Sequence, residues 1–219
     1  MQKQYSTLLF DLDGTLVDSG EGITKCAQYA LAQFGIHVDD YHTLRPFVGP
    51  PLEDSFKEFY GFSDEKAAEA VQAYRERYFE KGIYEQAPYP GVTDFLHTLR
   101  GRGYTMAIAT SKVQLQAERV VNELFPQLGP YFDYIFARDN ACTLHSKADV
   151  INHGLAVMGI TDRSKVLMIG DRKFDIQGAK ECHLDSLGVL YGFGSREEFE
   201  AAGADYICKD FSEVLNLLG

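Results

Sequence analysis

The chain has 219 residues, of which 45% are hydrophobic and 24% charged, as in ordinary globular proteins. This predicts one or two domains with a hydrophobic core and excludes disordered, collagenous, coiled-coil and small disulfide-rich classes. Acidic residues outnumber basic ones by 32 to 21, a net charge of -11. We therefore expect no nucleic-acid or anionic-membrane partner, and a small anionic substrate would need a local basic pocket.

Cysteine spacing and the apolar runs indicate the compartment. No Cys-x-x-Cys pair is present, which argues against a zinc site or a disulfide framework and favours free thiols in a reducing compartment. The apolar run Leu8–Phe10 is too short for a secretion signal or a membrane span. We therefore expect a soluble cytoplasmic protein. The four cysteines are Cys26, Cys142, Cys182 and Cys208.

The first predicted element is a strand at Thr7–Phe10, and the next strand begins only at Thr105. One crossover helix does not need so long a connection, so a separate unit is inserted there. Three stretches with apolar residues at helical spacing fill it. They end at Gly35, Gly61 and Gly82. We expect residues 16–87 to form a helical cap domain and residues 1–15 with 88–219 to form the core.

Further short apolar runs alternate with helical stretches through the rest of the chain, a pattern typical of an α/β fold. Their near-continuous apolarity predicts a parallel sheet covered by helices on both faces. The strands are predicted at Thr105–Ala109, Tyr134–Ala137, Val166–Ile169, Ser186–Leu190 and Asp205–Cys208.

The first strand runs directly into Asp11-Leu12-Asp13-Gly14-Thr15. Two carboxylates in this spacing can converge on one crevice once Gly14 turns the chain, one to attack a substrate and the other to move protons. The tetrapeptide Asp-x-Asp-Gly alone fits a calcium loop or a plain turn equally well. The rest of the chain has to decide between these interpretations.

Other predicted strands also deliver polar groups at their carboxyl ends, where open α/β sheets bind ligands. Thr110-Ser111-Lys112 follows the second strand, and Gly170-Asp171 with Asp175 follows the fourth. Lys147 lies at a predicted helix start, where a cation is disfavoured unless an anion such as phosphate is nearby. The sequence fits a Lys112 side chain at the site and one that points into solvent equally well. It also leaves open whether Tyr191–Ser195 forms a rim loop or a turn.

These motifs, in this order and spacing, resemble the haloacid dehalogenase superfamily, in its subgroup with a small helical cap. The resemblance covers essentially the whole chain and rests on Asp11–Thr15, Thr110, Lys147 and Asp171 with Asp175. It implies a Rossmann-like core with an inserted α-helical cap. Within that subgroup the chain looks like phosphoglycolate phosphatases and 5'-nucleotidases.

The resemblance implies a reaction through a phosphoaspartate. Asp11 would attack phosphorus, and Mg²⁺ would be bound by Asp11, Asp171 and the main-chain carbonyl of Asp13. Asp175 would support these ligands from outside the metal shell. Asp13 would also protonate the leaving oxygen and later activate water. The groups that would bind the phosphoryl oxygens are Thr110, Ser111 and Lys147.

The same resemblance sorts the possible activities. Asp13 argues against dehalogenases and phosphonate-cleaving members, and long membrane spans, which pump-type members carry, are absent from the sequence. A Mg²⁺-dependent phosphatase for a small phosphate monoester is favoured. A sugar-phosphate mutase and a non-catalytic phosphate-sensing module are the alternatives. Arg45 and Gly49 of the cap would contact the substrate, a small phosphorylated metabolite such as phosphoglycolate or a nucleoside monophosphate. A monomer and a homodimer remain equally open.

Overall fold

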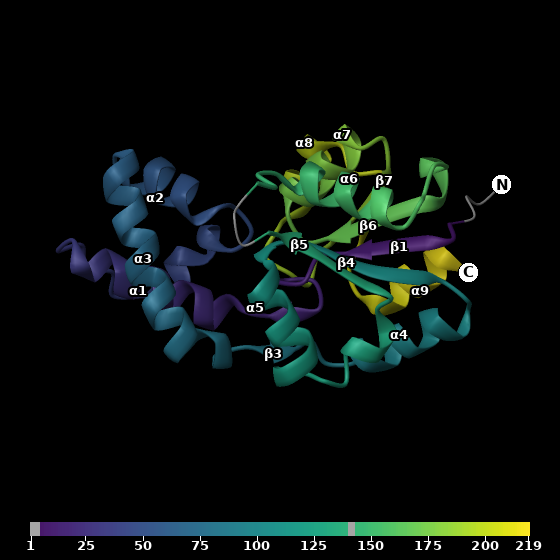
Figure 1. The fold of residues 1–219 in the computed structure, drawn as a ribbon, viewed down its shortest axis with the longest axis horizontal. Coiled ribbons are helices and arrows are strands. Elements are labelled where there is room, and N and C mark those ends of the chain that lie inside the picture. The colour runs from purple at the N-terminus through teal and green to yellow at the C-terminus, as the bar shows by residue number, and fades with distance from the viewer. Residues whose placement is uncertain (1–4, 140–142) are drawn as a thin grey trace. The chain divides into compact units, whose positions relative to one another are not determined.

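The computed structural model describes residues 5–139 and 143–219, so Cys142 lies outside the described residues. The chain divides into two units (Figure 1). The core unit comprises Met1–Leu16 and Pro88–Gly219, and the helical unit comprises Val17–Ala87. The two segments that join them, β2 (Val17–Asp18) and β3 (Ala87–Pro88), form a separate two-stranded sheet.

The core unit is built on a six-stranded parallel sheet with the strand order β5-β4-β1-β6-β7-β8. This confirms the predicted fold class. β1 is central, with Thr7–Phe10 hydrogen-bonded to Thr105–Ile108 on one side and to Val166–Ile169 on the other. The strands are β1 (Thr7–Phe10), β4 (Thr105–Val113), β5 (Tyr134–Arg138), β6 (Val166–Gly170), β7 (Asp185–Val189) and β8 (Tyr206–Cys208).

Helices cover both faces of this sheet, as Figure 1 shows, with α6 to α8 on one face and α4, α5 and α9 on the other. Alternate residues of β1 point to opposite faces. Phe10 meets the ring of Phe95 in α4, whereas Leu9 packs in a cluster with Ile151 of α6. The helices are α4 (Val92–Gly101), α5 (Gln114–Glu118), α6 (Lys147–Val157), α7 (Lys173–Glu181), α8 (Arg196–Ala202) and α9 (Phe211–Leu218).

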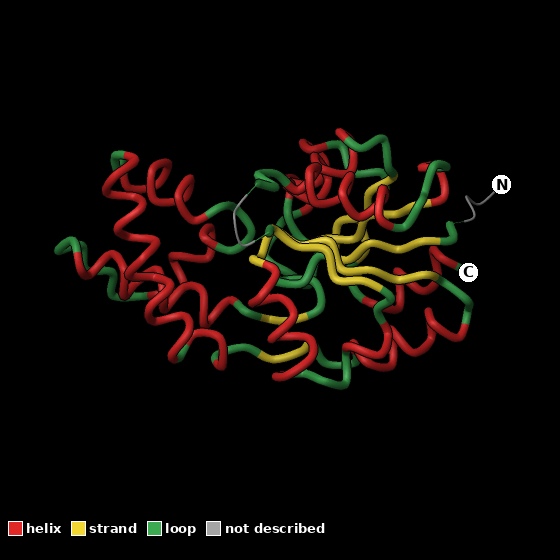
Figure 2. The backbone as a smooth tube through the Cα atoms, viewed as in Figure 1, coloured by secondary structure: helices red, strands yellow, loops and turns green. Residues whose placement is uncertain are grey.

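The helical unit contains the three expected α-helices, drawn in red in Figure 2. They are α1 (Gly20–Gln33), α2 (Leu52–Tyr60) and α3 (Asp64–Glu80). The hydroxyl of Ser63 accepts the backbone N–H of Lys66 and so caps α3. Short 3-10 turns at Tyr41–Phe47 and Gly82–Tyr84 follow α1 and α3.

Aromatic rings fill the interior of the helical unit. Phe56 stacks on Phe62 with ring centroids 5.8 Å apart, and Phe47 meets Phe56 edge-on at 5.0 Å. Tyr74 and Tyr78 are buried and stack on each other at 5.8 Å. These contacts give the unit an apolar core of its own, consistent with its separation from the core unit.

Two further features bear on the expectations from sequence. Within residues 5–139 and 143–219, no helix combines the length and the apolar character that crossing a membrane requires. The cysteines in the described part of the chain are buried, and none of them forms a disulfide with another described residue. They are Cys26, Cys182 and Cys208.

Candidate active site

The site lies at the carboxyl ends of the central strands of the core unit. β1 ends at Phe10, and the N–H of Asp11 still donates to the carbonyl of Ile169 at 2.9 Å, which carries the β1–β6 ladder one residue further. The chain then turns at Gly14, whose φ is +84°. A side chain there would be strained, and its Cβ would lie 2.1 Å from an oxygen of Asp171. Only glycine fits this turn beside Asp171.

Lys147 joins the ends of three elements through its ammonium group. It is the first residue of α6, which Ser146 and Asp149 cap through reciprocal hydrogen bonds. Its Nζ lies 2.9 Å from Oδ1 of Asp11 and 2.8 Å from Oδ1 of Asp175, and it donates to the carbonyl of Ala109 at 3.0 Å. Because the side chain is 4% exposed, this cation is held in place by partners rather than by water.

Three buried carboxylates lie together at this end of the sheet, and two of them, Asp11 and Asp175, contact the ammonium. Asp11, Asp171 and Asp175 each offer an oxygen, and these oxygens lie within 4.8 Å of one another. Burial raises the pKa of Asp11 to about 6, although Lys147 opposes the rise. Burial, followed by the charges of Asp175 and Asp11, raises the pKa of Asp171 well above its usual value. Burial lowers the pKa of Lys147, but its two carboxylate partners more than offset this and raise it overall.

The cluster therefore fits a divalent cation. Lys147 pairs with only two of the three carboxylates, so the cluster carries an excess of negative charge that costs free energy without a further cation. All the donors are oxygens, which hard cations such as Mg²⁺ prefer. Asp175 also accepts the N–H of Arg172 at 3.0 Å, so both of its oxygens have protein partners. Asp171 has no ammonium partner of its own among the described residues. A bound cation would therefore stabilise its ionised form more than that of the other two carboxylates.

A loop after β7 holds Asp171. The N–H of Phe193 donates to Oδ2 of Asp171 at 2.9 Å, and Thr15 Oγ1 lies 3.4 Å from Oδ1. The hydroxyl of Tyr191 donates to the carbonyl of Thr15 at 3.0 Å, which ties the loop to the turn after β1. A Cβ at Gly192 would lie 2.3 Å from Cβ of Asp171. The sequence left open whether Tyr191–Ser195 is a rim loop or a turn. In the structure this segment packs directly against the Asp171 carboxylate.

The end of β4 brings Thr110 to the same edge. Thr110 is 1% exposed, and its Oγ1 accepts the backbone N–H of Lys112 at 3.2 Å. Ser111 is half-buried beside it. Lys112 does not point into solvent, because its Nζ lies 3.0 and 2.9 Å from the two carboxylate oxygens of Asp13. Neither this pair nor the contact of Phe193 with Asp171 was expected from the sequence.

The structure thus brings together most of the expected site residues within the core unit. Lys147 contacts Asp11 and Asp175 directly, Asp171 lies beside these two carboxylates, and Ala109 links Lys147 to the strand that carries Thr110. Asp13 lies two residues beyond Asp11 and is half-buried.

Arg45 and Gly49 belong to the helical unit. Arg45 is exposed in the turn Tyr41–Phe47, and its carbonyl accepts the N–H of Val48 at 2.9 Å. Gly49 is half-buried, with a φ of +108°.

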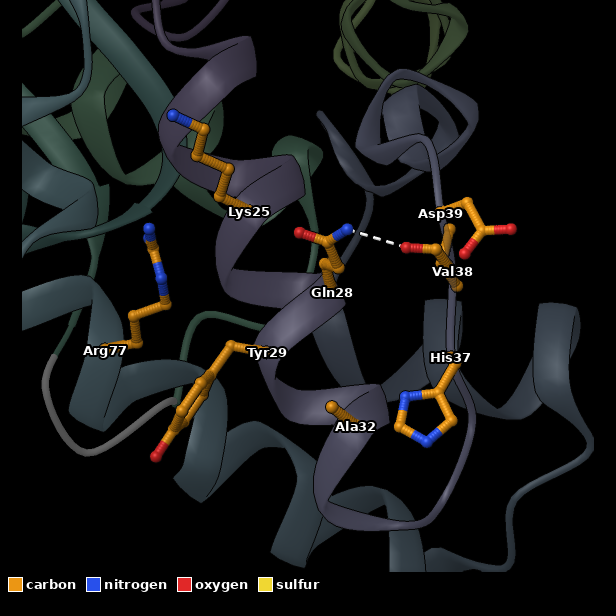
Figure 3. A pocket seen from close by; sticks show the side chains of 8 residues that line it. All are labelled: Lys25, Gln28, Tyr29, Ala32, His37, Val38, Asp39 and Arg77. Carbon is orange, nitrogen blue, oxygen red and sulfur yellow. Dashed lines mark hydrogen bonds between the residues drawn. The ribbon is translucent and has the colours of Figure 1, made fainter.

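The helical unit also has a pocket of about 540 Å³ beside α1, shown in Figure 3. Gln28 donates across one side of it to the carbonyl of Val38 at 2.6 Å. Arg45 and Gly49 are not among the residues that line it. These are Lys25, Gln28, Tyr29, Ala32, His37, Val38, Asp39 and Arg77.

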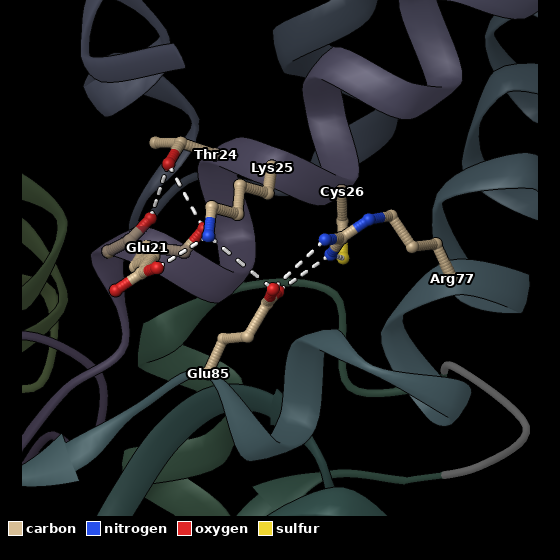
Figure 4. A network of polar contacts seen from close by, with 7 residues as sticks. Glu21, Thr24, Lys25, Cys26, Arg77 and Glu85 are labelled. Carbon is tan, nitrogen blue, oxygen red and sulfur yellow. Dashed lines mark hydrogen bonds and ion pairs between the residues drawn. The ribbon is translucent and has the colours of Figure 1, made fainter.

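The two cations at this pocket are engaged by carboxylates, as Figure 4 shows. Arg77 contacts Glu85 through two nitrogens at 2.8 and 3.1 Å, and it also lies 3.2 Å from the sulfur of Cys26. Lys25 pairs with Glu21 and lies 3.6 Å from Glu85. The hydrogen bonds from Arg77 hold the pKa of Glu85 below its usual value. Because both cations are already paired with carboxylates, this pocket is not a ready site for a phosphorylated ligand.

Comparison with known proteins agrees with the core site. Residues 8–189 match the family model described as haloacid dehalogenase-like hydrolase. A 5'-nucleotidase of Pseudomonas aeruginosa is 39% identical over 98% of this chain and 96% of its own, and a phosphoglycolate phosphatase of Caulobacter vibrioides is 30% identical over 95% and 89%. The crystal structure of a predicted phosphatase from Clostridium acetobutylicum superposes with a TM-score of 0.93 at 41% identity, covering 97% of both chains.

Proposed function

We propose a specific reaction for this chain, which belongs to the haloacid dehalogenase-like hydrolase family and is a phosphatase. It hydrolyses a small phosphate monoester through a phosphoaspartate on Asp11, with Mg²⁺ bound in the carboxylate cluster. The observation that supports this most strongly is the cluster of Asp11, Asp171 and Asp175, with Lys147 in contact with Asp11 and Asp175.

Asp11 and Asp171, with the main-chain carbonyl of Asp13, would hold the cation. When bound, Mg²⁺ supplies positive charge that offsets the repulsion between the Asp11 carboxylate and the anionic phosphoryl group. Asp175 lies against Lys147 and so fixes the ammonium rather than binding the cation. The excess negative charge of the buried cluster supports this assignment.

The chain's own residues carry out the phosphoryl transfer. A carboxylate oxygen of Asp11 forms a bond to phosphorus while the bond from phosphorus to the ester oxygen breaks. Thr110, through its hydroxyl, and Ser111, through its backbone N–H, donate to the phosphoryl oxygens. Lys147 balances the charge on both the phosphoryl group and Asp11. Its contact with Asp11 supports this role.

Asp13 handles the protons of both half-reactions. It gives a proton to the departing ester oxygen and later takes one from the water that attacks the phosphoaspartate. That attack breaks the bond between Asp11 and phosphorus, releases inorganic phosphate and restores the free carboxylate. The position of Asp13 two residues from Asp11 on the same turn supports this division of work.

The relatives and the helical unit support a proposal for the substrate class. Relatives named 5'-nucleotidase and phosphoglycolate phosphatase align over nearly the whole chain, so we propose a nucleoside monophosphate or a small phosphorylated acid as substrate. The helical unit serves as the cap, and Arg45 with Gly49 contacts the part of the substrate that leaves. We also propose a cytoplasmic location, which the buried thiols of Cys26, Cys182 and Cys208 support.

The test is phosphate release from a panel of nucleoside monophosphates, phosphoglycolate, pyrophosphate and hexose phosphates, with Mg²⁺ and with a chelator. We expect release that requires Mg²⁺ and concentrates on one class of ester. Asp11→Asn should reduce turnover by about 1,000-fold or more because it removes the nucleophile. Full turnover in Asp11→Asn, or isomerised sugar phosphate in place of free phosphate, would refute the proposal.

A further inference from the structure

We infer that Lys112 is a positioning residue for Asp13, an inference that rests on the proton-transfer role proposed above for Asp13. The ammonium holds the Asp13 carboxyl group in one orientation, from which its protonated form gives a proton to the leaving oxygen and the resulting carboxylate then takes one from the attacking water. Neither the sequence motifs nor the reaction described above assigns this lysine a role.

The contact between the two side chains is close and sheltered. Nζ of Lys112 lies 3.0 Å from Oδ1 and 2.9 Å from Oδ2 of Asp13, so the ammonium meets both oxygens of the carboxylate. The lysine side chain is 5% exposed and the aspartate side chain 13%. Lysine is rarely buried to this extent unless it is paired. The pair is therefore not an ordinary surface salt bridge, in which two solvated chains meet only part of the time.

The backbone of β4 brings Lys112 to this position. The parallel ladder with β5 is regular up to Thr110 and then shifts register, so that Val113 pairs with Arg138. Such irregularities redirect side chains and are common beside active sites. The N–H of Lys112 donates to Oγ1 of Thr110 at 3.2 Å, which fixes the irregular segment to a residue proposed to bind phosphate.

Contact with both oxygens constrains the part of Asp13 that matters for proton transfer. An aspartate carboxylate rotates easily about its last bond, because that torsion has a broad energy profile. An ammonium centred between the oxygens limits this rotation. Proton transfer needs hydrogen-bond distance to the reacting oxygen, and misplacing a reacting group by about 1 Å can cost about 100-fold in rate. We therefore expect loss of Lys112 to impair turnover through Asp13.

A different role is available to the same lysine, which could instead contact the substrate directly. The two roles differ in a double-mutant cycle. If Lys112 acts through Asp13, its removal has little further effect once Asp13 has lost its acid–base function. If Lys112 binds substrate, its removal raises KM in both backgrounds and the two effects combine.

The experiment compares Lys112→Met, Asp13→Asn and the double variant with the wild type. Steady-state kcat and KM are measured at saturating Mg²⁺ on the best alkyl phosphate and on p-nitrophenyl phosphate, whose leaving group needs no protonation. We expect Lys112→Met to lower kcat on the alkyl ester about 10–100-fold with KM within about 2-fold. The loss should be smaller on the nitrophenyl ester, and Lys112→Met should add less than about 2-fold in the Asp13→Asn background.

Two further variants complete the design. Lys112→Arg keeps the charge and should recover part of kcat. Lys209→Met is the matched control, because Lys209 is a core-unit lysine with a 70% exposed side chain, and this variant should behave as wild type. If Lys112→Met does not fold, as judged by circular dichroism, Lys112→Arg and the double variant carry the test, since neither leaves Asp13 as an unpaired charge.

The outcomes separate this inference from the proposed function. Wild-type kcat in Lys112→Met overturns the positioning role alone. If Lys112→Met does not fold, a double variant with a kcat about 10-fold or more below that of Asp13→Asn overturns it. A raised KM that adds to the effect of Asp13→Asn also overturns it, in favour of direct substrate contact. An inactive wild type, or an Asp13→Asn variant as active as wild type, overturns the proposed function and the inference with it.

Discussion

Replacing Gly192 by alanine tests whether the loop after β7 positions Asp171. The added Cβ would lie 2.3 Å from Cβ of Asp171 and 2.4 Å from the carbonyl oxygen of Gly14. Ordinary van der Waals contact begins at 3.4 Å, so the loop or Asp171 has to move by about 1 Å. One of the two obstructing atoms belongs to the backbone, which cannot move aside as the end of a flexible side chain can.

The size of the effect follows from this overlap. Overpacking a filled site costs about 1–3 kcal/mol of the free energy of unfolding. Moving the loop also lengthens the hydrogen bond from the Phe193 N–H to Asp171, which measures 2.9 Å. Loss of a hydrogen bond to a metal ligand lowers metal affinity about 10–100-fold. We therefore expect Gly192→Ala to bind Mg²⁺ 10–100-fold more weakly.

Two measurements check this expectation. Urea unfolding without Mg²⁺ gives the loss of stability, and calorimetric titration with Mg²⁺ alone gives the affinity without any need for turnover. Gly101→Ala is the matched control, because a Cβ at Gly101 meets nothing within 4 Å. The control should keep its Mg²⁺ affinity and its stability, or gain up to about 1 kcal/mol.

Two results would contradict this expectation. If Gly192→Ala matched the wild type both in Mg²⁺ affinity and in stability, the loop would be free to retreat from Asp171. Phe193 would then have no part in holding that carboxylate. Loss of stability with unchanged affinity would place Asp171 outside the metal shell.

Three further predictions concern charge. Burial raises the pKa of Asp11 to about 6, and only the ionised form attacks, so kcat/KM should fall as the pH drops through about 6 at low Mg²⁺. Saturating Mg²⁺ should move this acidic limb of the pH–rate profile to lower pH. An acidic limb that does not change with Mg²⁺ would contradict the metal assignment. Arg100 holds the pKa of Asp133 below its ordinary 3.8. The ion pair therefore stabilises the fold fully above pH 3.8, and this stabilisation is lost as the pH falls through the lowered pKa of Asp133. Arg100→Met should lower the free energy of unfolding by about 1 kcal/mol at pH 7 and by progressively less in acid, which urea unfolding would measure. In the helical unit, Arg77→Met removes an ion pair with two contacts and should cost about 1–2 kcal/mol in the same assay. Arg75→Met, whose partner lies 3.9 Å away, should cost almost nothing.

The sequence predicted the sheet well because parallel strands are buried on both faces and so appear as uninterrupted apolar runs. β1 has the predicted bounds, and the others differ at their ends by a few residues. The largest difference is β4, which continues through Lys112 to Val113. Polarity indicated a strand end there, whereas pairing with β5 after a shift of register extends the strand.

The candidate site was predictable only where residue type and spacing carry information. Asp11, Asp171 and Lys147 follow predicted strands or begin a predicted helix, and parallel topology then places them together. The hydrogen bond from the Phe193 N–H to Asp171 could not be predicted from residue type, because any residue except proline can donate it. The pair of Lys112 with Asp13 joins residues far apart in the chain, which periodicity cannot detect.

The central position of β1 has a consequence for the order of folding. Residues 7–10 pair only with residues 105–108 and 166–169, whereas the helical unit is one continuous segment of local contacts. Because chains fold from the amino terminus as they are synthesised, that segment can acquire its structure on the ribosome before the strands that pair with β1 have been made. Asp11 is made before Ile169, so its hydrogen bond to that residue can form only after the whole segment between them has been translated.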